Sequence, residues 1–208
     1  MEAAGEVFAE VGYRAATVRQ ICEKAGANIA AVNYYFGDKA GLYLAVLRSV
    51  PDAHAEKYPP QFGLTPDATA AEQLHAYVQS LLQRVFDPGR PGWHVKLVAR
   101  ETAEPTAAFD TLLEDFARPL HRELASIVRR LLGPGATDEH VRLGALSVMG
   151  QCVYYHHARA VLKHLYPEQT YGDDDIARLV DYITEFSLAA LKDLARRNQA
   201  ESDAFCKN

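Results

Sequence analysis

Apolar residues recur every three or four positions along nearly the whole chain, which is the spacing of amphipathic helices. The regular alternation of apolar and polar residues that is typical of strands is absent from the sequence. Glycine and proline divide the pattern into segments, most clearly at Asp87-Pro-Gly and Gly133-Pro-Gly. We therefore predict an all-α fold.

The first 50 residues hold four short helical segments. The first ends at Gly12, as a glycine after the last turn often does. The second begins with Thr17-Val18-Arg19-Gln20, a capping box in which the Thr17 hydroxyl and the Gln20 side chain each bond the other's backbone N–H. Asn28 and Asp38 are good N-caps for a third and a fourth helix.

Longer helices follow a proline-rich stretch, which we interpret as a domain boundary near residue 51. The predicted ranges are 70–86, 92–103, 106–132 with a kink at Pro119, 138–165 and 173–197. The last two are apolar on more than one face, so they must be buried on more than one side. We expect them to form a four-helix interface between two copies of the chain.

Composition narrows the class of protein. Of 208 residues, 49% are hydrophobic, enough for a core, and the net charge of −5 argues against a wholly basic nucleic-acid coat. The three cysteines, Cys22, Cys152 and Cys206, are widely spaced and form no C-x-x-C pair, which favours a reducing, cytoplasmic location. Neither a signal peptide nor an apolar run of about 20 residues is present, so no membrane is expected.

Residues 17–25 and 28–36, joined by a turn at Gly26, have the spacing of a helix-turn-helix, whose second helix lies in the DNA major groove. Its outward side chains would be Asn28, Ala30, Asn33 and Tyr34. Asn33 can donate and accept at a base edge, and a tyrosine hydroxyl can reach a phosphate. Lys39 stands in the first turn of the next helix, where a cation opposes the helix dipole, and a phosphate contact would explain it. On spacing alone, an ordinary helical bundle remains an alternative.

The stretch from Phe8 to Leu47 resembles the DNA-binding domain of TetR-family transcriptional regulators. The residues that match the family pattern in order are Phe8, Gly12, Tyr13, Thr17, Ile21, Ala25, Gly26, Asn33, Tyr34, Tyr35, Phe36, Lys39 and Leu42. The resemblance implies DNA contacts at Thr17, Asn28, Asn33, Tyr34 and Lys39. It also implies that Tyr35 and Phe36 pack inside the domain.

Two later stretches, Arg100–Asp110 and Val148–Arg159, resemble the C-terminal domain of the CecR-like subgroup of this family. The resemblance implies a DNA-binding domain at 1–50 and an effector-binding and dimerisation domain at 51–208. The function that it implies is a ligand-responsive repressor, which binds palindromic operator DNA as a homodimer and is released by a small-molecule effector.

The headpiece departs from the family in two ways. The family normally has a basic arm and half a helix before the point where this chain begins, so we expect that the true N-terminus is missing. Residues 1–50 also carry five basic and five acidic side chains. Because phosphate attraction dominates DNA affinity, a neutral headpiece would bind weakly unless an arm supplies charge.

Polar or amphipathic residues on otherwise apolar helices are candidates for the effector pocket, because such pockets pair apolar walls with a few polar groups. We select Trp93, Arg100, Gln151, Tyr154 and Tyr155, and we expect an apolar or aromatic effector. The alternative is that the arginine pairs with a neighbouring glutamate and the tyrosines are ordinary core residues.

Enzyme and metal functions find little support in the sequence. Glu72-Gln-Leu-His75 is a single Glu-x-x-His motif, whereas a di-iron bundle needs two and further glutamates. The adjacent pair His156 and His157 diverges by about 100° on a helix, so the two cannot easily share an ion. We expect no cofactor and no catalytic site. The remaining alternative is a helical small-molecule-binding protein whose headpiece does not bind DNA.

Overall fold

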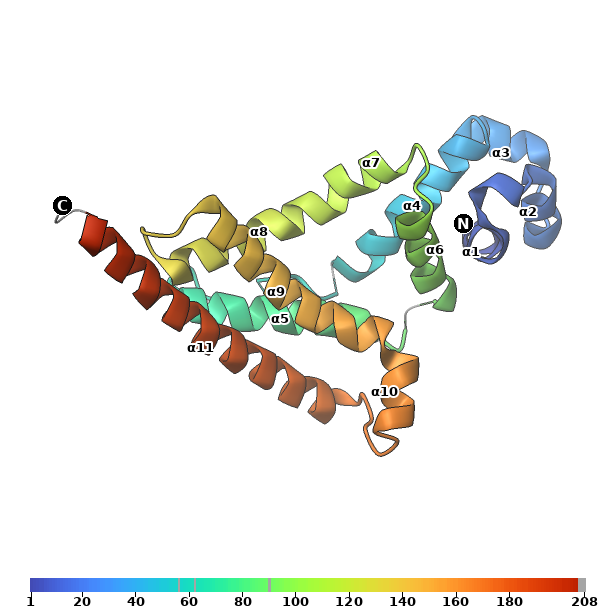
Figure 1. The fold of residues 1–208 in the computed structure, drawn as a ribbon. Helices are drawn as coiled ribbons and strands as arrows, with labels where there is room; N and C mark the ends of the chain where they lie inside the picture. Colours follow the sequence, from blue (N-terminus) through green and yellow to red (C-terminus); the bar gives the residue numbers. More distant parts are fainter. Residues whose placement is uncertain (56, 62, 90, 206–208) are drawn as a thin grey trace. The chain divides into compact units, whose positions relative to one another are not determined.

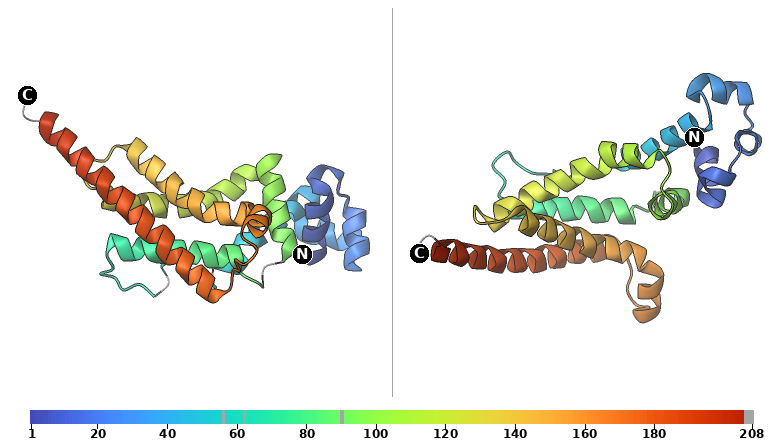
Figure 2. Two further views of the ribbon diagram at one scale, coloured as in Figure 1. Left: turned by 60° about the horizontal axis from the view of Figure 1, so that its bottom comes forward. Right: turned by 45° about the horizontal axis from the view of Figure 1, so that its top comes forward.

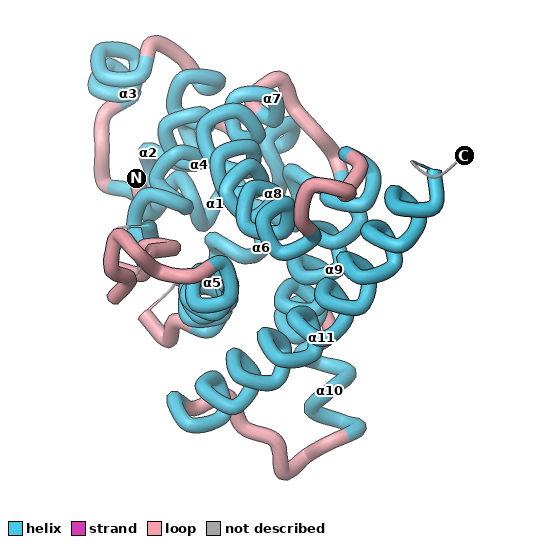
Figure 3. Tube along the Cα trace, turned by 90° about the vertical axis from the view of Figure 1, so that its left-hand side faces the viewer, coloured by secondary structure: helices cyan, strands magenta, loops and turns pink. Residues whose placement is uncertain are grey.

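The computed structural model describes residues 1–55, 57–61, 63–89 and 91–205, so Cys206 lies outside the described residues. Every regular element in this part is helical, which confirms the predicted all-α fold (Figure 3). The chain divides into two compact units, one within residues 1–57 and 88–119 and the other within residues 58–87 and 120–208. None of the described helices is both long and apolar enough to cross a membrane.

The first unit holds the short helices of the chain's beginning together with a later helical segment (Figure 1). Its helices are α1 (Glu2–Ala15), α2 (Val18–Ala25), α3 (Ile29–Phe36), α4 (Lys39–Ala55), α6 (Gly92–Ala103) and α7 (Phe109–Leu112), followed by the π-helical turn η1 (Leu113–Ala117). Phe8, Leu42, Val46, Leu47 and Leu97 are fully buried at its centre. This core fixes α1 and α4, and α2 and α3 pack at their ends.

The second unit is built from α5 (Ala70–Phe86), α8 (Arg118–Leu132), α9 (Asp138–His157), α10 (Arg159–Leu165) and α11 (Asp173–Phe205). The long helix α11 packs along both α5 and α9, as Figures 1 and 2 show. Its core includes Leu74, Leu124, Val148, Cys152 and Ile183, each at most 1% exposed.

The helices at 70–86 and 92–103 have the predicted bounds, whereas the other three long helices differ. The helix predicted at 173–197 is α11, which continues to Phe205. The predicted helix 106–132 is divided into α7, the π-helical turn η1 and α8. Pro119 lies inside α8 directly after that turn; a proline has no N–H for the usual helical bond, and a wider turn before it accommodates this. The predicted helix 138–165 is broken at Ala158, where φ is −86° and ψ is 6°. No glycine or proline marks that break in the sequence.

Candidate nucleic-acid interface and effector cavity

The helix-turn-helix is set by local capping. The Thr17 hydroxyl accepts a hydrogen bond from the Gln20 backbone N–H at 3.2 Å, and Gln20 Oε1 accepts one from the Thr17 N–H at 3.0 Å, so the predicted capping box is present. Gly26 ends α2 in the left-handed region with φ +61°, and Asn28 Oδ1 then accepts from the Ala30 N–H at 2.9 Å to begin α3. These caps fix the turn between the two helices.

One side of α3 is free and the other is packed. Val32 is buried and Phe36 is half-buried on the inner side, four residues apart. Asn28, Ala30, Asn33 and Tyr34, the four residues predicted to face outward, are all exposed, and so is Thr17 at the start of α2. Tyr34 is 83% exposed.

Tyr35 does not pack inside the domain, as the resemblance had implied. Its side chain is 74% exposed, and its ring meets that of Tyr34 edge to face with centroids 5.0 Å apart. In a helix of eight residues the inward stripe has room for Val32 and Phe36, and the neighbouring position 35 is turned about 100° away from Phe36.

Lys39 has a contact that the sequence did not reveal. Its ammonium donates to the backbone carbonyls of Tyr13 and Ala16, both at 3.0 Å, and to that of Arg14 at 3.4 Å. It also lies 4.7 Å from the centroid of the Tyr13 ring. These carbonyls end α1, where a cation is favourable to the helix dipole. The lysine therefore holds α4 against the end of α1.

Trp93 and Arg100, both predicted to bind an effector, join α6 to α1 instead. Trp93 is 8% exposed, its Nε1 donates to Glu2 Oε1 at 2.6 Å, and a Cβ at Gly5 would stand only 2.5 Å from its ring. Arg100 donates from Nε to the Ala9 carbonyl at 3.0 Å and from Nη2 to the Glu10 carbonyl at 2.9 Å.

A buried hydrogen-bond group joins α4 to α6 beside these contacts. The Glu101 carboxylate, 1% exposed, accepts from the Tyr43 hydroxyl at 2.5 Å and from the Thr106 N–H and hydroxyl at 2.8 Å each. Burial, and then the hydrogen bond to Glu101, raise the pKa of Tyr43. Sequence reasoning missed this group, because no spacing rule links residues 43 and 101.

The structure brings the other three predicted effector residues together in the second unit. Gln151, Tyr154 and Tyr155 line a cavity of about 600 Å³ between α9, α10 and the first half of α11. We call it the tyrosine cavity; its remaining walls are Gly150, Leu162, Tyr166, Gln169, Tyr182 and Ile183. Gln151 Nε2 donates to Ser187 Oγ at 3.2 Å, which fixes its orientation. Trp93 and Arg100 do not line this cavity, so the five residues form no single site.

An apolar face lies on α9 and α11 next to the tyrosine cavity. Leu143, Leu146 and Tyr154 on α9 are more than half exposed, and so are Tyr182 and Phe186 on α11. The three exposed residues of α9 lie on one side of the helix, because positions 143, 146, 150 and 154 are three or four residues apart. Exposed apolar side chains gathered on one face are typical of interaction sites.

Comparisons with known proteins agree with these features. The chain matches the model of the CecR C-terminal domain family, described as "HTH-type transcriptional dual regulator CecR, C-terminal domain", over residues 70–191, and that of the tetR family of bacterial regulatory proteins over residues 1–46. The chain belongs to the TetR family, in its CecR-like subgroup. The second match includes α2 and α3, and the first includes α6 as well as α9.

Two relatives show how far the sequence similarity extends. The transcriptional dual regulator CecR of Shigella flexneri is 34% identical over 121 residues, 54% of this chain and 54% of that protein. The regulator BetI of Klebsiella pneumoniae is 31% identical over 78 residues, 38% of this chain and 40% of that protein. The matches thus span about half, or less, of the relatives' length.

Solved structures share the fold of this TetR-family chain. AibR in complex with isovaleryl coenzyme A and operator DNA has a TM-score of 0.62 at 18% identity, covering 89% of this chain and 94% of AibR. FadR of Bacillus subtilis in complex with stearoyl-CoA has a TM-score of 0.58 at 17% identity, covering 90% of this chain and 95% of FadR.

Proposed function

We propose that the chain is a ligand-responsive transcriptional repressor that binds a palindromic operator as a homodimer. The observation that carries the proposal is α3, a capped eight-residue helix whose outer side presents Asn28, Ala30, Asn33 and Tyr34 to solvent next to the turn at Gly26. Relatives named as transcriptional regulators support it.

The proposed DNA contacts divide by chemistry. Asn33 can pair with a base edge through both its amide and its carbonyl, and Ala30 lets the helix backbone approach the groove. The Thr17 and Tyr34 hydroxyls and the exposed amide of Asn28 can meet phosphates. Lys39 stands near this face; to meet a phosphate its ammonium would have to give up a carbonyl of α1.

The proposed dimer uses the apolar face of α9 and α11. Two copies that cover this face with a two-fold axis would form a four-helix contact, and the same two-fold symmetry matches a palindromic operator whose half-sites lie about one helical turn apart. A stable interface buries more than about 1,200 Å², which two helices from each copy can supply.

The proposed effector is an apolar or aromatic molecule bound in the tyrosine cavity. The described residues that line the cavity include four tyrosines and two glutamines, but no lysine or arginine. AibR and FadR are solved with coenzyme A thioesters, whose phosphates need cations, so we favour an uncharged ligand here. Because this cavity adjoins the dimer face, a ligand in it would alter the packing of two copies and so the spacing of their recognition helices.

The test is a mobility-shift titration of the chain with the DNA upstream of its own gene, followed by a thermal-shift screen of uncharged aromatic compounds. The proposal expects a specific shift that a screened compound reverses. Gln151→Leu should lower the affinity for that compound about tenfold. Gln79→Leu, which removes an amide from α5, should leave the affinity unchanged. A compound that binds while the chain shifts no DNA would favour a small-molecule-binding protein without operator recognition.

A further inference from the structure

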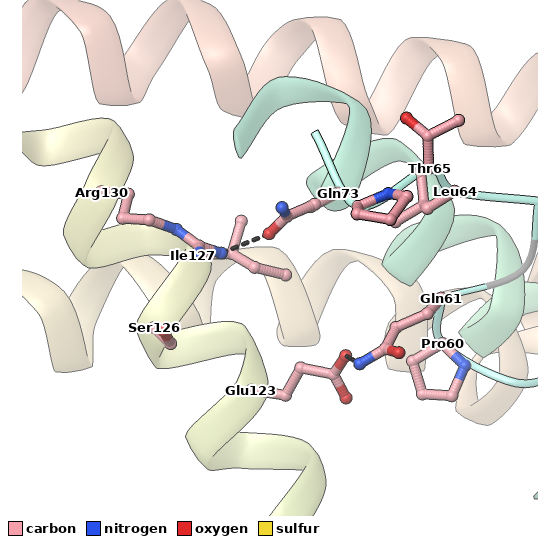
Figure 4. A pocket seen from close by; sticks show the side chains of 10 residues that line it. Pro60, Gln61, Leu64, Thr65, Gln73, Glu123, Ser126, Ile127 and Arg130 are labelled. Carbon is pink, nitrogen blue, oxygen red and sulfur yellow. Dashed lines mark hydrogen bonds between the residues drawn. The ribbon is translucent and has the colours of Figure 1, made fainter. Parts of the chain in front are cut away.

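A second cavity, of about 530 Å³, lies in the second unit between the segment before α5, the start of α5 and one side of α8 (Figure 4). It shares no lining residue with the tyrosine cavity. Its volume is that of a site for a small organic molecule. This cavity could not be predicted from helical spacing, because the proline-rich segment that forms one wall has no helical pattern.

The wall formed by α8 has a charge at each end and an apolar residue between them. Glu123, Ile127 and Arg130 follow steps of four and three, so they share one side of the helix. Seven residues separate the two charged positions by about 10 Å along the helix axis. Leu64 lines the cavity from the proline-rich segment, as Figure 4 shows.

Each of the two charges is held by a neutral amide. Arg130 Nη2 donates to Gln73 Oε1, and Gln61 Nε2 donates to Glu123 Oε1 at a long 3.4 Å (Figure 4). Within the part of the chain that the structure describes, neither side chain is in an ion pair. A guanidinium has further N–H donors and a carboxylate has further lone pairs, so both retain capacity for a ligand.

The two charged ends of the cavity favour different chemical groups of a ligand. A carboxylate fits Arg130, since a guanidinium binds it with two parallel hydrogen bonds. At the other end Arg84 is close enough to interact electrostatically with Glu123, while its Nε donates to the Tyr58 carbonyl at 2.8 Å. That cation disfavours an ammonium beside Glu123, whereas a hydroxyl can donate to the carboxylate without repulsion.

We propose that this cavity binds a small aliphatic carboxylic acid with a hydroxyl at its far end. Arg130 holds the carboxylate, Leu64 and Ile127 flank the methylene chain, and Glu123 accepts the hydrogen bond of the hydroxyl. The site is separate from the tyrosine cavity and requires no DNA, so its test does not depend on operator binding.

The test is calorimetric titration of the full chain with three probes: 6-hydroxyhexanoate, hexanoate and 1-hexanol. We expect 6-hydroxyhexanoate to bind most tightly and 1-hexanol most weakly. Arg130→Gln should lower the affinity for both acids at least about tenfold. Glu123→Met should lower the affinity for 6-hydroxyhexanoate and leave the affinity for hexanoate unchanged.

The matched control is Arg122→Gln, which removes the same charge from an exposed position of the same helix and should leave all three affinities unchanged. Arg130→Lys keeps the charge and should retain part of the affinity, and thermal unfolding of each variant verifies that it is folded. Absence of heat with every probe at tens of millimolar would overturn the proposal. So would equal affinity of folded Arg130→Gln and the parent for hexanoate, or equal affinity of the parent for all three probes.

Discussion

At the scale of single residues, Lys39 shows how one side chain can serve the fold at a position where DNA chemistry was expected. All three of its carbonyl acceptors belong to the segment that follows Gly12, where φ is +81° and the regular course of α1 is interrupted. The ammonium satisfies carbonyls that the helix leaves without partners.

Lys39→Met should therefore lower the stability of the first unit. Loss of charged hydrogen bonds to otherwise unpaired carbonyls should reduce the free energy of unfolding by about 1–3 kcal/mol. Urea unfolding measures it, with Lys96→Met, an exposed lysine on α6, as the control. Unchanged stability together with a salt slope of DNA binding reduced by about one would show that Lys39 acts on a phosphate instead.

Cys152 gives a prediction for alkaline pH. Burial raises the pKa of its thiol to about 12, from 9.0 in an unperturbed chain. Between these values the unfolded state loses the proton and the folded state keeps it, so the free energy of unfolding falls as pH rises, by about 1.4 kcal/mol per pH unit. Below pH 9 the thiol has no such effect.

Urea unfolding at several pH values from 8 to 11 should show this decline, and Cys152→Ala should make it shallower by the contribution of one proton. Tyr43 and Tyr77, whose pKa values burial also raises, should account for the decline that remains in the variant. An identical pH dependence in parent and variant would mean that the buried thiol is not what titrates.

At the scale of the helices, α9 and α11 each contribute side chains both to the core of the second unit and to the exposed apolar face. Val148, Cys152 and Ile183 point into the core of their own unit, whereas Leu146 and Phe186 are more than half exposed. A substitution at Ile183 would therefore disturb folding before it disturbed assembly, and the exposed pair is the better probe of the dimer.

Leu146→Asp and Phe186→Asp should each convert the proposed dimer into a folded monomer, because each places a charge in the proposed apolar interface. Light scattering at micromolar concentration gives the mass, and circular dichroism verifies the fold. Tyr34→Asp, an equally drastic change of an exposed aromatic on α3, should remain dimeric. A parent chain that is monomeric under these conditions would contradict the proposed assembly.

The helices that sequence reasoning predicted well have local signals at their ends. α2 and α3 begin at the predicted caps Thr17 and Asn28, and both caps are formed by hydrogen bonds within three residues. Two features that sequence reasoning missed join residues far apart in the chain, namely the contact of Arg100 with α1 and the Tyr43–Glu101 bond. The break at Ala158 was missed because no glycine or proline marks it.

Only the part of the proposed effector site that lies on one helix could be predicted from the sequence. Gln151, Tyr154 and Tyr155 lie on one helix, so their common cavity follows from spacing. Trp93 has the chemistry of an effector-binding residue, but its place in the fold depends on Gly5, which gives its ring room and is distant in the sequence.

At the scale of the whole molecule, charge limits how DNA could be held. The net charge is −5, and of the basic side chains in residues 1–50 the structure pairs Arg19 with Glu23, Lys24 with Glu6, and Arg48 with Asp115. These partners compete with phosphates. We therefore expect operator binding by this chain to depend weakly on salt and to rely more on contacts to base edges than on attraction to the backbone.

The proposed contact of α3 with the operator is tested by titrating the operator and an unrelated duplex at several salt concentrations, with the parent, Asn33→Ala and the control Gln79→Ala. Asn33→Ala should lose about 1–3 kcal/mol of binding free energy at the operator only, with an unchanged salt slope because an amide carries no charge. Gln79→Ala should match the parent. If Asn33→Ala binds the operator as tightly as the parent, α3 does not read the groove, and the proposed function is wrong.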